Sequence, residues 1–371
     1  MLLFALSHAY GQPFDVGSRS QEFYDADRDR TIGCTIHYPA SVSGSEAPVA
    51  AGTFPVLVHG HGFVMTVDAY DNLRDGLVPR GYILVLPTTE GGFAPDHAAF
   101  GADLAFLAGA LQAANAEPTS PFFAHVANST ALLGHSMGGG ASMLAAASTN
   151  SVQAVVNFAA AETNPSAIDA ASLIDVPTLM FAATEDCVTP ATSAQRPMFD
   201  AISAPCKAFV NVVGGGHCYF AANSFTCSLG ELTCGPDLTI TREEQNDVII
   251  DFAGLWLDHF LRGDGAALNA FRDSVALSDR VIAEHTCLTT AVEDKGVTEW
   301  SLAPVPAIDV LHILSPPSGA FFHLLDACGR ILRSGVVPEG GLDVSALSNG
   351  PYRLVIRSGS KTGSRAFYVA R

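Results

Sequence analysis

Short runs of consecutive apolar residues alternate with segments of helical spacing along most of the chain. The apolar runs cover residues 31–38, 54–58, 82–86, 131–133, 154–158, 178–182 and 208–213. Helical spacing is found over residues 68–80, 100–111, 141–148 and 243–261. Apolar runs of this length, separated by helices, are typical of parallel strands buried on both faces. We therefore predict an α/β domain over residues 12–290, built on a doubly wound, mostly parallel sheet.

The pattern changes towards the C-terminus. Short strands are predicted over residues 310–314, 321–325, 330–332, 352–357 and 366–369. Gly, Pro, Ser and Asn turns separate them, which indicates a small all-β sandwich over residues 307–371. Residues 291–306 contain Pro304 and Pro306 and show no periodicity, so we interpret them as a linker.

Charge and the N-terminus bear on location and partners. The formal net charge of −18 disfavours nucleic acid or an anionic membrane as the main partner, because both attract basic proteins. No later segment has the long apolar run of a membrane span, so stable membrane insertion is not expected. Residues 1–11 are apolar and end in Ala9-Tyr10-Gly11, which resembles a signal peptide without its usual charged start. We expect a secreted protein, extracellular or at the cell surface.

Eight cysteines are present, and none of them forms a C-x-x-C pair. They are Cys34, Cys187, Cys206, Cys218, Cys227, Cys234, Cys287 and Cys328. In an exported protein such a set predicts a disulfide framework, whose connectivity the spacing does not fix. Cys187–Cys206 and Cys227–Cys234 would close short loops. Buried free thiols are the alternative.

The segment Gly134-His135-Ser136-Met137-Gly138 fits the G-x-S-x-G pattern of a nucleophile elbow. It follows an apolar run and precedes a helical segment of small residues, which is the context that this turn requires. Glycine at both ends allows close approach of the flanking strand and helix. A glycine-rich turn that happens to contain a serine is the alternative interpretation.

A serine hydroxyl needs a base to accept its proton and an acid to orient that base. His217 follows a strand and three glycines, and it is the predicted base. His135 also lies near the turn, but as the neighbour of Ser136 its side chain should point elsewhere. Asp186 follows the strand at residues 178–182 and is the predicted acid, with Glu185 as the alternative.

The oxyanion of an acyl-transfer intermediate requires two hydrogen-bond donors. The backbone amide of Met137 is one candidate, because it follows the nucleophile. The amide of Phe63, in the loop after residues 54–58, is the other. His59 and His61 in that loop are alternative metal ligands, although no acidic cluster accompanies them. We therefore expect neither a metal nor an organic cofactor.

Spacing along the chain bears on substrate size. Ser136 and Asp186 are separated by 50 positions, which a helix, two strands and a link nearly fill. No lid domain fits between them, so we expect an open cleft suited to bulky or polymeric esters. Residues 224–237 form a loop that would be one wall of the cleft beside His217.

The motifs resemble those of cutinase-like polyester (PET) hydrolases in the α/β-hydrolase superfamily. The resemblance rests on residues 134–140, on Val176-Pro177-Thr178-Leu179, on Asp186 with Val188-Thr189-Pro190, and on His217. Residues 59–62 and 80–82 also resemble the dienelactone hydrolase and chlorophyllase-like group. The resemblance implies that Phe63 and His135 contact substrate. The polyester enzymes carry a tryptophan where this chain has Ala159-Ala160-Ala161-Glu162, a departure that weakens the aromatic clamp.

The last 60-odd residues resemble the C-terminal sorting domain of the type IX secretion pathway. The resemblance rests on residues 326–330, 342–347 and 350–356 in that order. It implies export, with the secretion machinery as a partner. An accessory β-sandwich with a role in substrate binding is the alternative.

These features together predict a secreted serine carboxylic ester hydrolase that cleaves neutral esters, polyesters among them, and acts as a monomer. A serine peptidase or an acyltransferase on the same fold is one alternative. A non-catalytic surface-binding protein is another.

Overall fold

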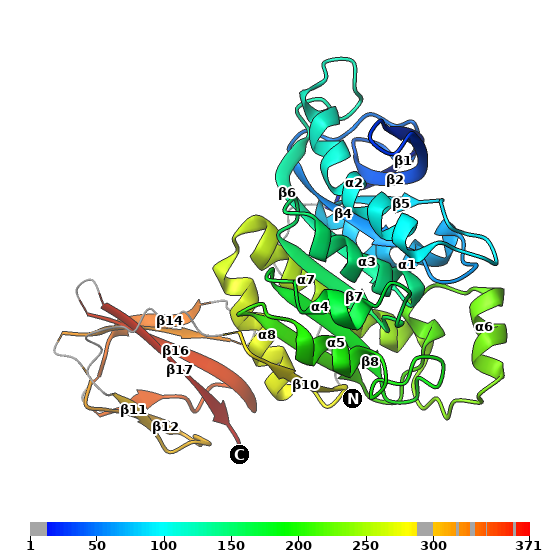
Figure 1. Cartoon of the computed structure of the whole chain (residues 1–371). Helices are drawn as coiled ribbons and strands as arrows, with labels where there is room; N and C mark the ends of the chain where they lie inside the picture. The colour runs from blue at the N-terminus through cyan, green and yellow to red at the C-terminus, as the bar shows by residue number, and fades with distance from the viewer. Residues whose placement is uncertain (1–12, 288–299, 317–318, 327–330, 339, 359–360) are drawn as a thin grey trace. The chain divides into compact units, whose positions relative to one another are not determined.

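The computed structural model describes residues 13–287, 300–316, 319–326, 331–338, 340–358 and 361–371 (Figure 1). The chain divides into a larger compact unit, Gln12–Cys287, and a smaller one that contains Leu288–Arg371. The expected signal peptide at residues 1–11 lies outside the described residues. Among the described helices, none combines the length and apolar composition needed to cross a bilayer.

The larger unit is built on a ten-stranded sheet with the strand order β10-β9-β8-β7-β6-β4-β5-β2-β1-β3. Its strands are β1 (Asp15–Asp25), β2 (Arg30–Ala40), β3 (Gly44–Ser45), β4 (Phe54–Gly60), β5 (Ile83–Pro87), β6 (Val126–His135), β7 (Ala154–Phe158), β8 (Thr178–Ala183), β9 (Lys207–Val212) and β10 (Val281–His285). Strands β4 to β9 pair in parallel, whereas β2 and β10 pair antiparallel to their neighbours β5 and β9. The predicted doubly wound, mostly parallel sheet is confirmed.

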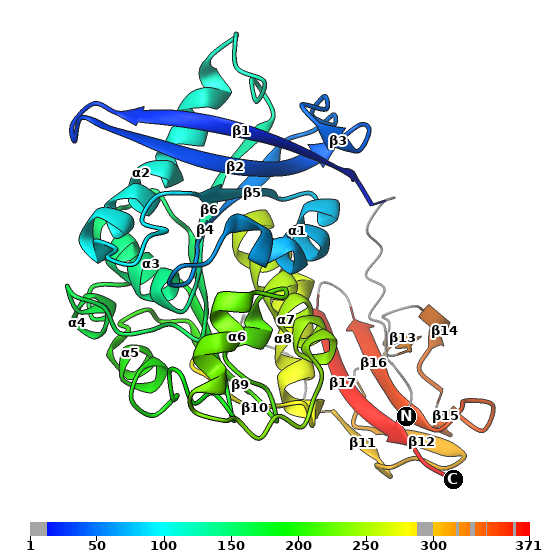
Figure 2. The same ribbon diagram turned by 90° about the vertical axis from the view of Figure 1, so that its right-hand side faces the viewer.

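Helices cover both faces of this sheet (Figure 2). They are η1 (Val67–Tyr70), α1 (Asp71–Leu77), η2 (Val78–Arg80), α2 (His97–Ala116), α3 (Met137–Ser148), α4 (Ala167–Ala171), α5 (Gln195–Ala201), η3 (Cys218–Phe220), α6 (Phe225–Leu232), α7 (Arg242–Arg262) and α8 (Gly265–Leu277). Along β4, Val56 and Val58 pack into the core shared with α2 to α5, and Leu57 packs into the core shared with α1, α7 and α8. The strand is apolar at nearly every position because both of its faces are buried.

Local signals fix the ends of the long helix α7. The Thr241 hydroxyl accepts a hydrogen bond from the Glu244 amide, and the Glu244 carboxylate accepts one from the Thr241 amide. The helix ends before Gly263, whose φ of 72° is in the left-handed region that glycine tolerates. The observed helix extends the predicted one by a single residue at each end. Its position matters because α7 contacts the loop that carries His217.

Two antiparallel sheets make up the smaller unit, with strand orders β11-β12-β15 and β14-β13-β16-β17. The strands are β11 (Ser301–Ala303), β12 (Val310–Leu314), β13 (Phe321–Leu325), β14 (Ile331–Val336), β15 (Leu342–Asp343), β16 (Gly350–Ser358) and β17 (Lys361–Val369). Trp300, Leu311, Phe322 and Leu354 are buried together in its core. This unit is the small β domain that the sequence predicts.

The linker predicted over residues 291–306 is revised at its C-terminal end. Trp300 is buried in the core of the β unit, and β11 pairs with β12, so residues 300–303 belong to that unit. Short turns with prolines obscured this strand in the sequence. Residues 288–299 lie outside the described residues, as do residues 327–330 of the sorting-domain motif.

Candidate active site

Ser136 lies in the sharp turn between β6 and α3. Its φ of 55° and ψ of −122° are strained for a residue with a side chain. A Cβ atom on Gly134 would clash with the backbone of Gly138, and one on Gly138 would clash with the backbone of Gly60. Only glycine at both positions therefore allows this turn, which presents the Ser136 hydroxyl at the N-terminus of α3.

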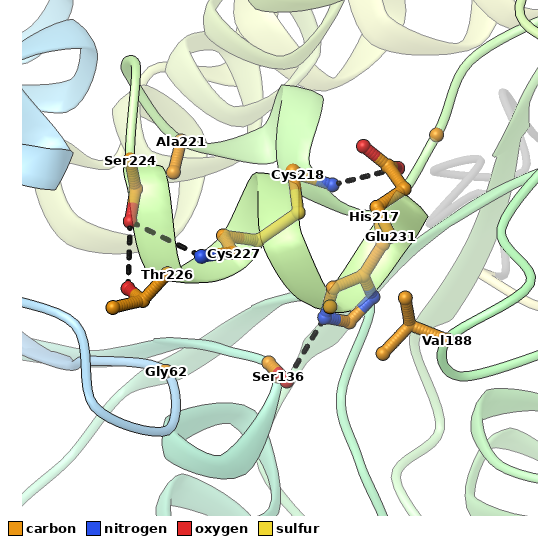
Figure 3. The surroundings of a disulfide bond; sticks show 12 residues. Gly62, Ser136, Val188, His217, Cys218, Ala221, Ser224, Thr226, Cys227 and Glu231 are labelled. Carbon is orange, nitrogen blue, oxygen red and sulfur yellow. Dashed lines mark hydrogen bonds between the residues drawn. A yellow bond between two sulfur atoms is a disulfide. The ribbon is translucent and has the colours of Figure 1, made fainter. Parts of the chain in front are cut away.

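The structure brings the predicted base to this serine. Nε2 of His217 lies 3.0 Å from Oγ of Ser136 (Figure 3). His217 follows β9 and the glycine run, where Gly214 has a φ of 73°. The peptide of Gly216 is held by Gln245 of α7, which accepts from its N–H at 3.0 Å and donates to its C=O at 2.9 Å. No motif in the sequence marks this glutamine.

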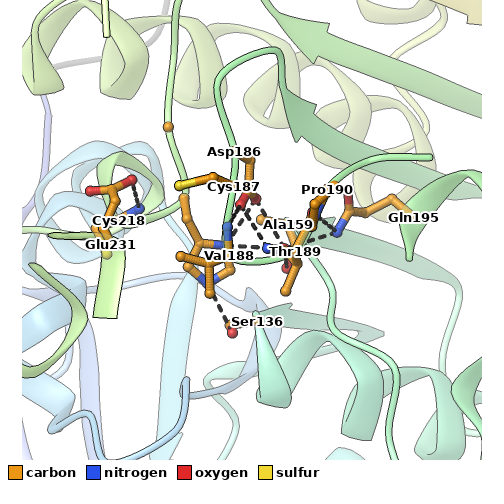
Figure 4. A network of polar contacts seen from close by, with 12 residues as sticks. Ser136, Ala159, Asp186, Cys187, Val188, Thr189, Pro190, Gln195, Cys218 and Glu231 are labelled. Atoms are coloured by element: carbon orange, nitrogen blue, oxygen red, sulfur yellow. Dashed lines mark hydrogen bonds and ion pairs between the residues drawn. The ribbon is translucent and has the colours of Figure 1, made fainter. Parts of the chain in front are cut away.

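Asp186 completes the constellation from the loop after β8. Its Oδ2 lies 2.9 Å from Nδ1 of His217, and its Oδ1 accepts from the amides of Val188 at 2.9 Å and Thr189 at 2.8 Å. The carboxylate is buried and fully hydrogen-bonded (Figure 4). The alternative acid, Glu185, accepts instead from the Thr184 hydroxyl at 3.0 Å.

Two residues that sequence analysis missed support this carboxylate. The Thr189 hydroxyl lies 3.0 Å from Asp186 Oδ2 and 3.0 Å from His217 Nδ1. Gln195, at the start of α5, is completely buried and donates from Nε2 to Thr189 Oγ1 at 3.1 Å and to the Ala160 carbonyl at 2.7 Å. A pattern in the sequence does not reveal such partners, because α5 reaches this loop only in the folded chain.

The expectation that His135 contacts substrate needs correction, because its ring is completely buried. Nδ1 lies 3.2 Å from the Tyr70 hydroxyl, and Nε2 lies 3.1 Å from the carbonyl oxygen of His217. Burial and the neighbouring His217 hold the pKa of His135 well below its ordinary value. The neutral ring therefore carries its proton on Nε2 and donates it to the backbone carbonyl of His217.

The predicted oxyanion donors come from two places, the loop after β4 for Phe63 and the start of α3 for Met137. Within the described residues, the Phe63 amide has no hydrogen-bond partner, whereas the Gly62 amide donates to the Tyr70 hydroxyl at 2.7 Å. The Met137 amide belongs to the first turn of α3, whose N–H groups have no acceptor inside the helix. These two amides are available to a developing negative charge.

His59, near the end of β4, and His61, in the loop that follows, are both buried. The ring nitrogens of His61 lie 2.9 Å from the Gly62 carbonyl oxygen and 2.8 Å from that of Thr89, an environment unlike that of a metal ligand. Across the part of the chain that the structure describes, no group of three His, Cys, Asp or Glu side chains is placed to hold a metal ion.

The family can now be assigned. The model of the PET hydrolase-like family (PETase) matches residues 11–233, which is more than half of the chain. The chain belongs to the PET hydrolase-like family. Ser136, Asp186 and His217 all lie inside the matched region, whereas α7, α8 and the smaller β unit lie beyond it.

Among the residues that the structure describes, this PET hydrolase-like chain has three disulfides, and their pairing corrects the sequence prediction. They are Cys187–Cys234, Cys206–Cys287 and Cys218–Cys227. The predicted pairs followed proximity along the chain, but the segment with α6 lies close to the loops that carry Asp186 and His217 and supplies a partner to each. Cys34 is a buried free thiol, whose pKa burial raises to about 12.

Two exposed aromatic side chains lie close together in this PET hydrolase-like unit. One of them, Phe63, belongs to the loop after β4, which we call the oxyanion loop. Phe63 is 50% exposed and Phe93 is 86% exposed, and their ring centroids lie 6.4 Å apart in an edge-to-face arrangement. At the residues where the sequence departs from the polyester enzymes, Ala159 and Ala160 are buried. The exposed aromatic pair is therefore Phe63 and Phe93, and the segment at Ala159 and Ala160 contributes no aromatic side chain.

Proposed function

We propose that this member of the PET hydrolase-like family is a secreted serine carboxylic ester hydrolase. The observation that carries the proposal is the continuous hydrogen-bonded series from Ser136 Oγ through the His217 ring to Asp186. The two links measure 3.0 Å and 2.9 Å, distances suited to proton transfer and to orientation of the base.

In the proposed reaction, Ser136 Oγ attacks the ester carbonyl while Nε2 of His217 accepts the hydroxyl proton. Asp186 holds Nδ1–H and stabilises the imidazolium that forms. The amides of Phe63 and Met137 donate to the oxyanion. His217 then protonates the departing alcohol oxygen. Water, deprotonated by the same ring, attacks the acyl-enzyme and releases the acid with regeneration of Ser136.

We further propose neutral esters, polyesters among them, as the substrates. The acidic net charge disfavours anionic substrates, and the exposed Phe63 and Phe93 offer an apolar contact beside the site. The absent tryptophan leaves Phe63 without the second half of an aromatic clamp, so we expect aliphatic polyesters to be cleaved better than aromatic ones.

Export is the remaining part of the proposal. Three disulfides in the larger unit are compatible with an oxidising compartment. The smaller β unit would act as the secretion sorting domain, with the export machinery as its partner, and the mature enzyme would act as a monomer. Deleting residues 300–371 from the expressed gene should retain the protein inside the cell, which immunoblotting of culture fractions would show.

The activity is tested by comparing the parent protein with Ser136→Ala on p-nitrophenyl butyrate and on a matched p-nitroanilide. The parent should cleave the ester, label with a fluorophosphonate probe and leave the anilide nearly untouched. The variant should lose both cleavage and labelling. Faster anilide cleavage would instead indicate a peptidase, and an unlabelled parent would indicate a non-catalytic binding protein.

A further inference from the structure

Helix α6 has two faces of opposite character. Phe225, Leu229 and Leu232 follow one another at intervals of four and three residues, so they share one face. These side chains are 81%, 54% and 76% exposed. Cys227 and Glu231 lie on the opposite face, which is turned towards the protein. We call the exposed face, Phe225 with Leu229 and Leu232, the α6 ridge.

Covalent bonds rather than apolar packing hold this helix in place. Cys227 is bonded to Cys218 (Figure 3). Cys234, just beyond the helix, is bonded to Cys187. The buried Glu231 accepts from the Cys218 amide at 3.2 Å. An amphipathic helix normally folds by burying its apolar face, but here the polar and disulfide-bonded face is inside. The disulfides allow the apolar face to remain outside.

The anchors place the ridge at the candidate active site. Cys187 directly follows Asp186, and Cys218 directly follows His217. At the start of the helix, the Thr226 hydroxyl donates to the Val64 carbonyl at 3.0 Å. Val64 is the neighbour of Phe63, so α6 contacts three of the loops that surround the serine. The helix that carries the ridge is therefore tied to the loops of Asp186, His217 and Phe63.

The chemistry of the ridge selects one kind of occupant. Glu231 is the single charged residue of α6, and it is buried on the other face. The ridge consequently offers large apolar side chains without a charged group. Such a surface suits an uncharged, water-insoluble phase and offers no charged group to recognise ionic headgroups. Because α6 is bonded to the residues that directly follow Asp186 and His217, an occupant of the ridge would be held near the candidate active site.

We propose that the α6 ridge is an adsorption surface for a solid aliphatic polyester, which it holds against the active site. The inference rests on the proposed ester hydrolase function and extends it from soluble esters to polymer surfaces. The ridge contacts the polymer at a distance from the scissile bond. It therefore determines how much enzyme is adsorbed on the solid and does not change the rate of the chemical step.

The test compares Phe225→Ser/Leu229→Ser with a control of the same composition, Phe123→Ser/Leu173→Ser. Phe123 and Leu173 are 44% and 68% exposed, and each precedes a parallel strand, at the sheet edge opposite the site. The full chain is assayed for hydrolysis of p-nitrophenyl butyrate, for depletion from solution by poly(ε-caprolactone) film, and for mass loss of that film.

We expect the ridge variant to adsorb about tenfold less and to erode the film correspondingly more slowly, because two large apolar contacts are lost. Its hydrolysis of the soluble ester should equal that of the parent and the control. Unchanged film adsorption would overturn the proposal, as would equal losses in the ridge and control variants. A drop in dimer content on sedimentation with unchanged adsorption would assign the ridge to a second copy instead. A parent that is inactive on the soluble ester would refute the proposed function itself.

Discussion

The hydroxyl oxygen of Thr189 lies 3.0 Å from Oδ2 of Asp186, the same carboxylate oxygen that contacts the His217 ring. Gln195 donates from Nε2 to this hydroxyl oxygen at 3.1 Å, so the hydroxyl proton of Thr189 is free to point to another acceptor. The carboxylate at 3.0 Å is the charged acceptor within reach, and a charge-assisted bond is stronger than one to the Ala159 carbonyl at 3.2 Å. Thr189 is therefore a positioning residue for the acid.

The first prediction follows from this bond. Thr189→Val removes the hydroxyl and keeps the backbone amide that donates to Asp186. Loss of one bond to a carboxylate, worth about 1–2 kcal/mol, should lower kcat about five- to thirtyfold with little change in KM. Thr189→Ser should recover most of the rate. Steady-state kinetics on p-nitrophenyl butyrate, measured from about pH 6 to about pH 9, would give kcat and KM for both variants.

A purely structural role for Thr189 would give a different pattern. In that case the valine variant, which fills the same volume, should behave as the parent does. A loss confined to KM would likewise contradict the positioning role, because the hydroxyl is in contact with the acid and base rather than with substrate.

The second prediction concerns the Tyr70 hydroxyl, which accepts from the Gly62 amide and faces His135 Nδ1. Tyr70→Phe leaves a buried amide and a buried ring nitrogen without partners. The free energy of unfolding should fall by about 1–3 kcal/mol, and kcat/KM should fall because the oxyanion loop and the His217 backbone are both loosened. Tyr24→Phe is the control, since Tyr24 is 60% exposed. Denaturant unfolding that is equal in the two variants would refute the role of Tyr70.

The centre of the sheet was predictable because its signals are local. β4 is apolar at nearly every position, as burial on both faces requires, and the glycines around Ser136 mark a turn that only they permit. Chain order then led to Asp186 and His217, which the structure brings within hydrogen-bonding distance of each other. These inferences depend on the local pattern around each residue and on the order of the residues along the chain.

The first strand was missed for a physical reason. β1, Asp15–Asp25, alternates exposed and partly buried positions and contains few apolar residues. It pairs antiparallel with β2 along its full length near the sheet edge, where water covers much of it. At the sheet edge a segment becomes a strand through its backbone pairing with a neighbour and through the turn that joins the two. A search for apolar runs detects neither of these.

The polar partners of the site were missed for a related reason. Gln195 and Gln245 reach the acid and histidine loops from helices α5 and α7, after the helices have packed on the sheet. Glutamine is common on helix surfaces, so neither position stands out in the sequence. Disulfide pairing depends on the same tertiary placement, and the short-loop prediction was therefore wrong.

The third prediction separates two disulfides. Cys218→Ser/Cys227→Ser opens a loop of nine residues, and we expect a loss of about 2–3 kcal/mol in unfolding free energy. It should also lower ester hydrolysis, because Cys218 adjoins His217. Cys206→Ser/Cys287→Ser opens a loop of 81 residues, at strand ends far from Ser136. The free energy of unfolding should therefore fall, while kcat measured at about 25 °C should be retained. Equal effects on kcat would contradict this distinction.

The last prediction is the acid sensitivity that His59 imparts. Burial lowers the pKa of His59 from 6.5 to about 3, and neither ring nitrogen has a hydrogen-bond partner among the described residues. Between these two values the unfolded chain binds a proton that the folded chain excludes. The folded state consequently loses stability as pH falls below 6.5, by up to about 1.4 kcal/mol per pH unit for this group.

His59→Leu removes this protonation site and replaces an unpartnered polar ring with an apolar side chain. The unfolding free energy of the variant should fall less steeply than that of the parent from pH 6.5 to pH 4.5, about the window in which His59 resists its proton. His135, whose pKa is also lowered by burial, should retain its own share of the slope in the variant. Denaturant titrations at several pH values give both slopes. Parallel slopes would mean that His59 gains its proton in the folded state, which a buried ring beside Tyr70 and Phe158 should prevent.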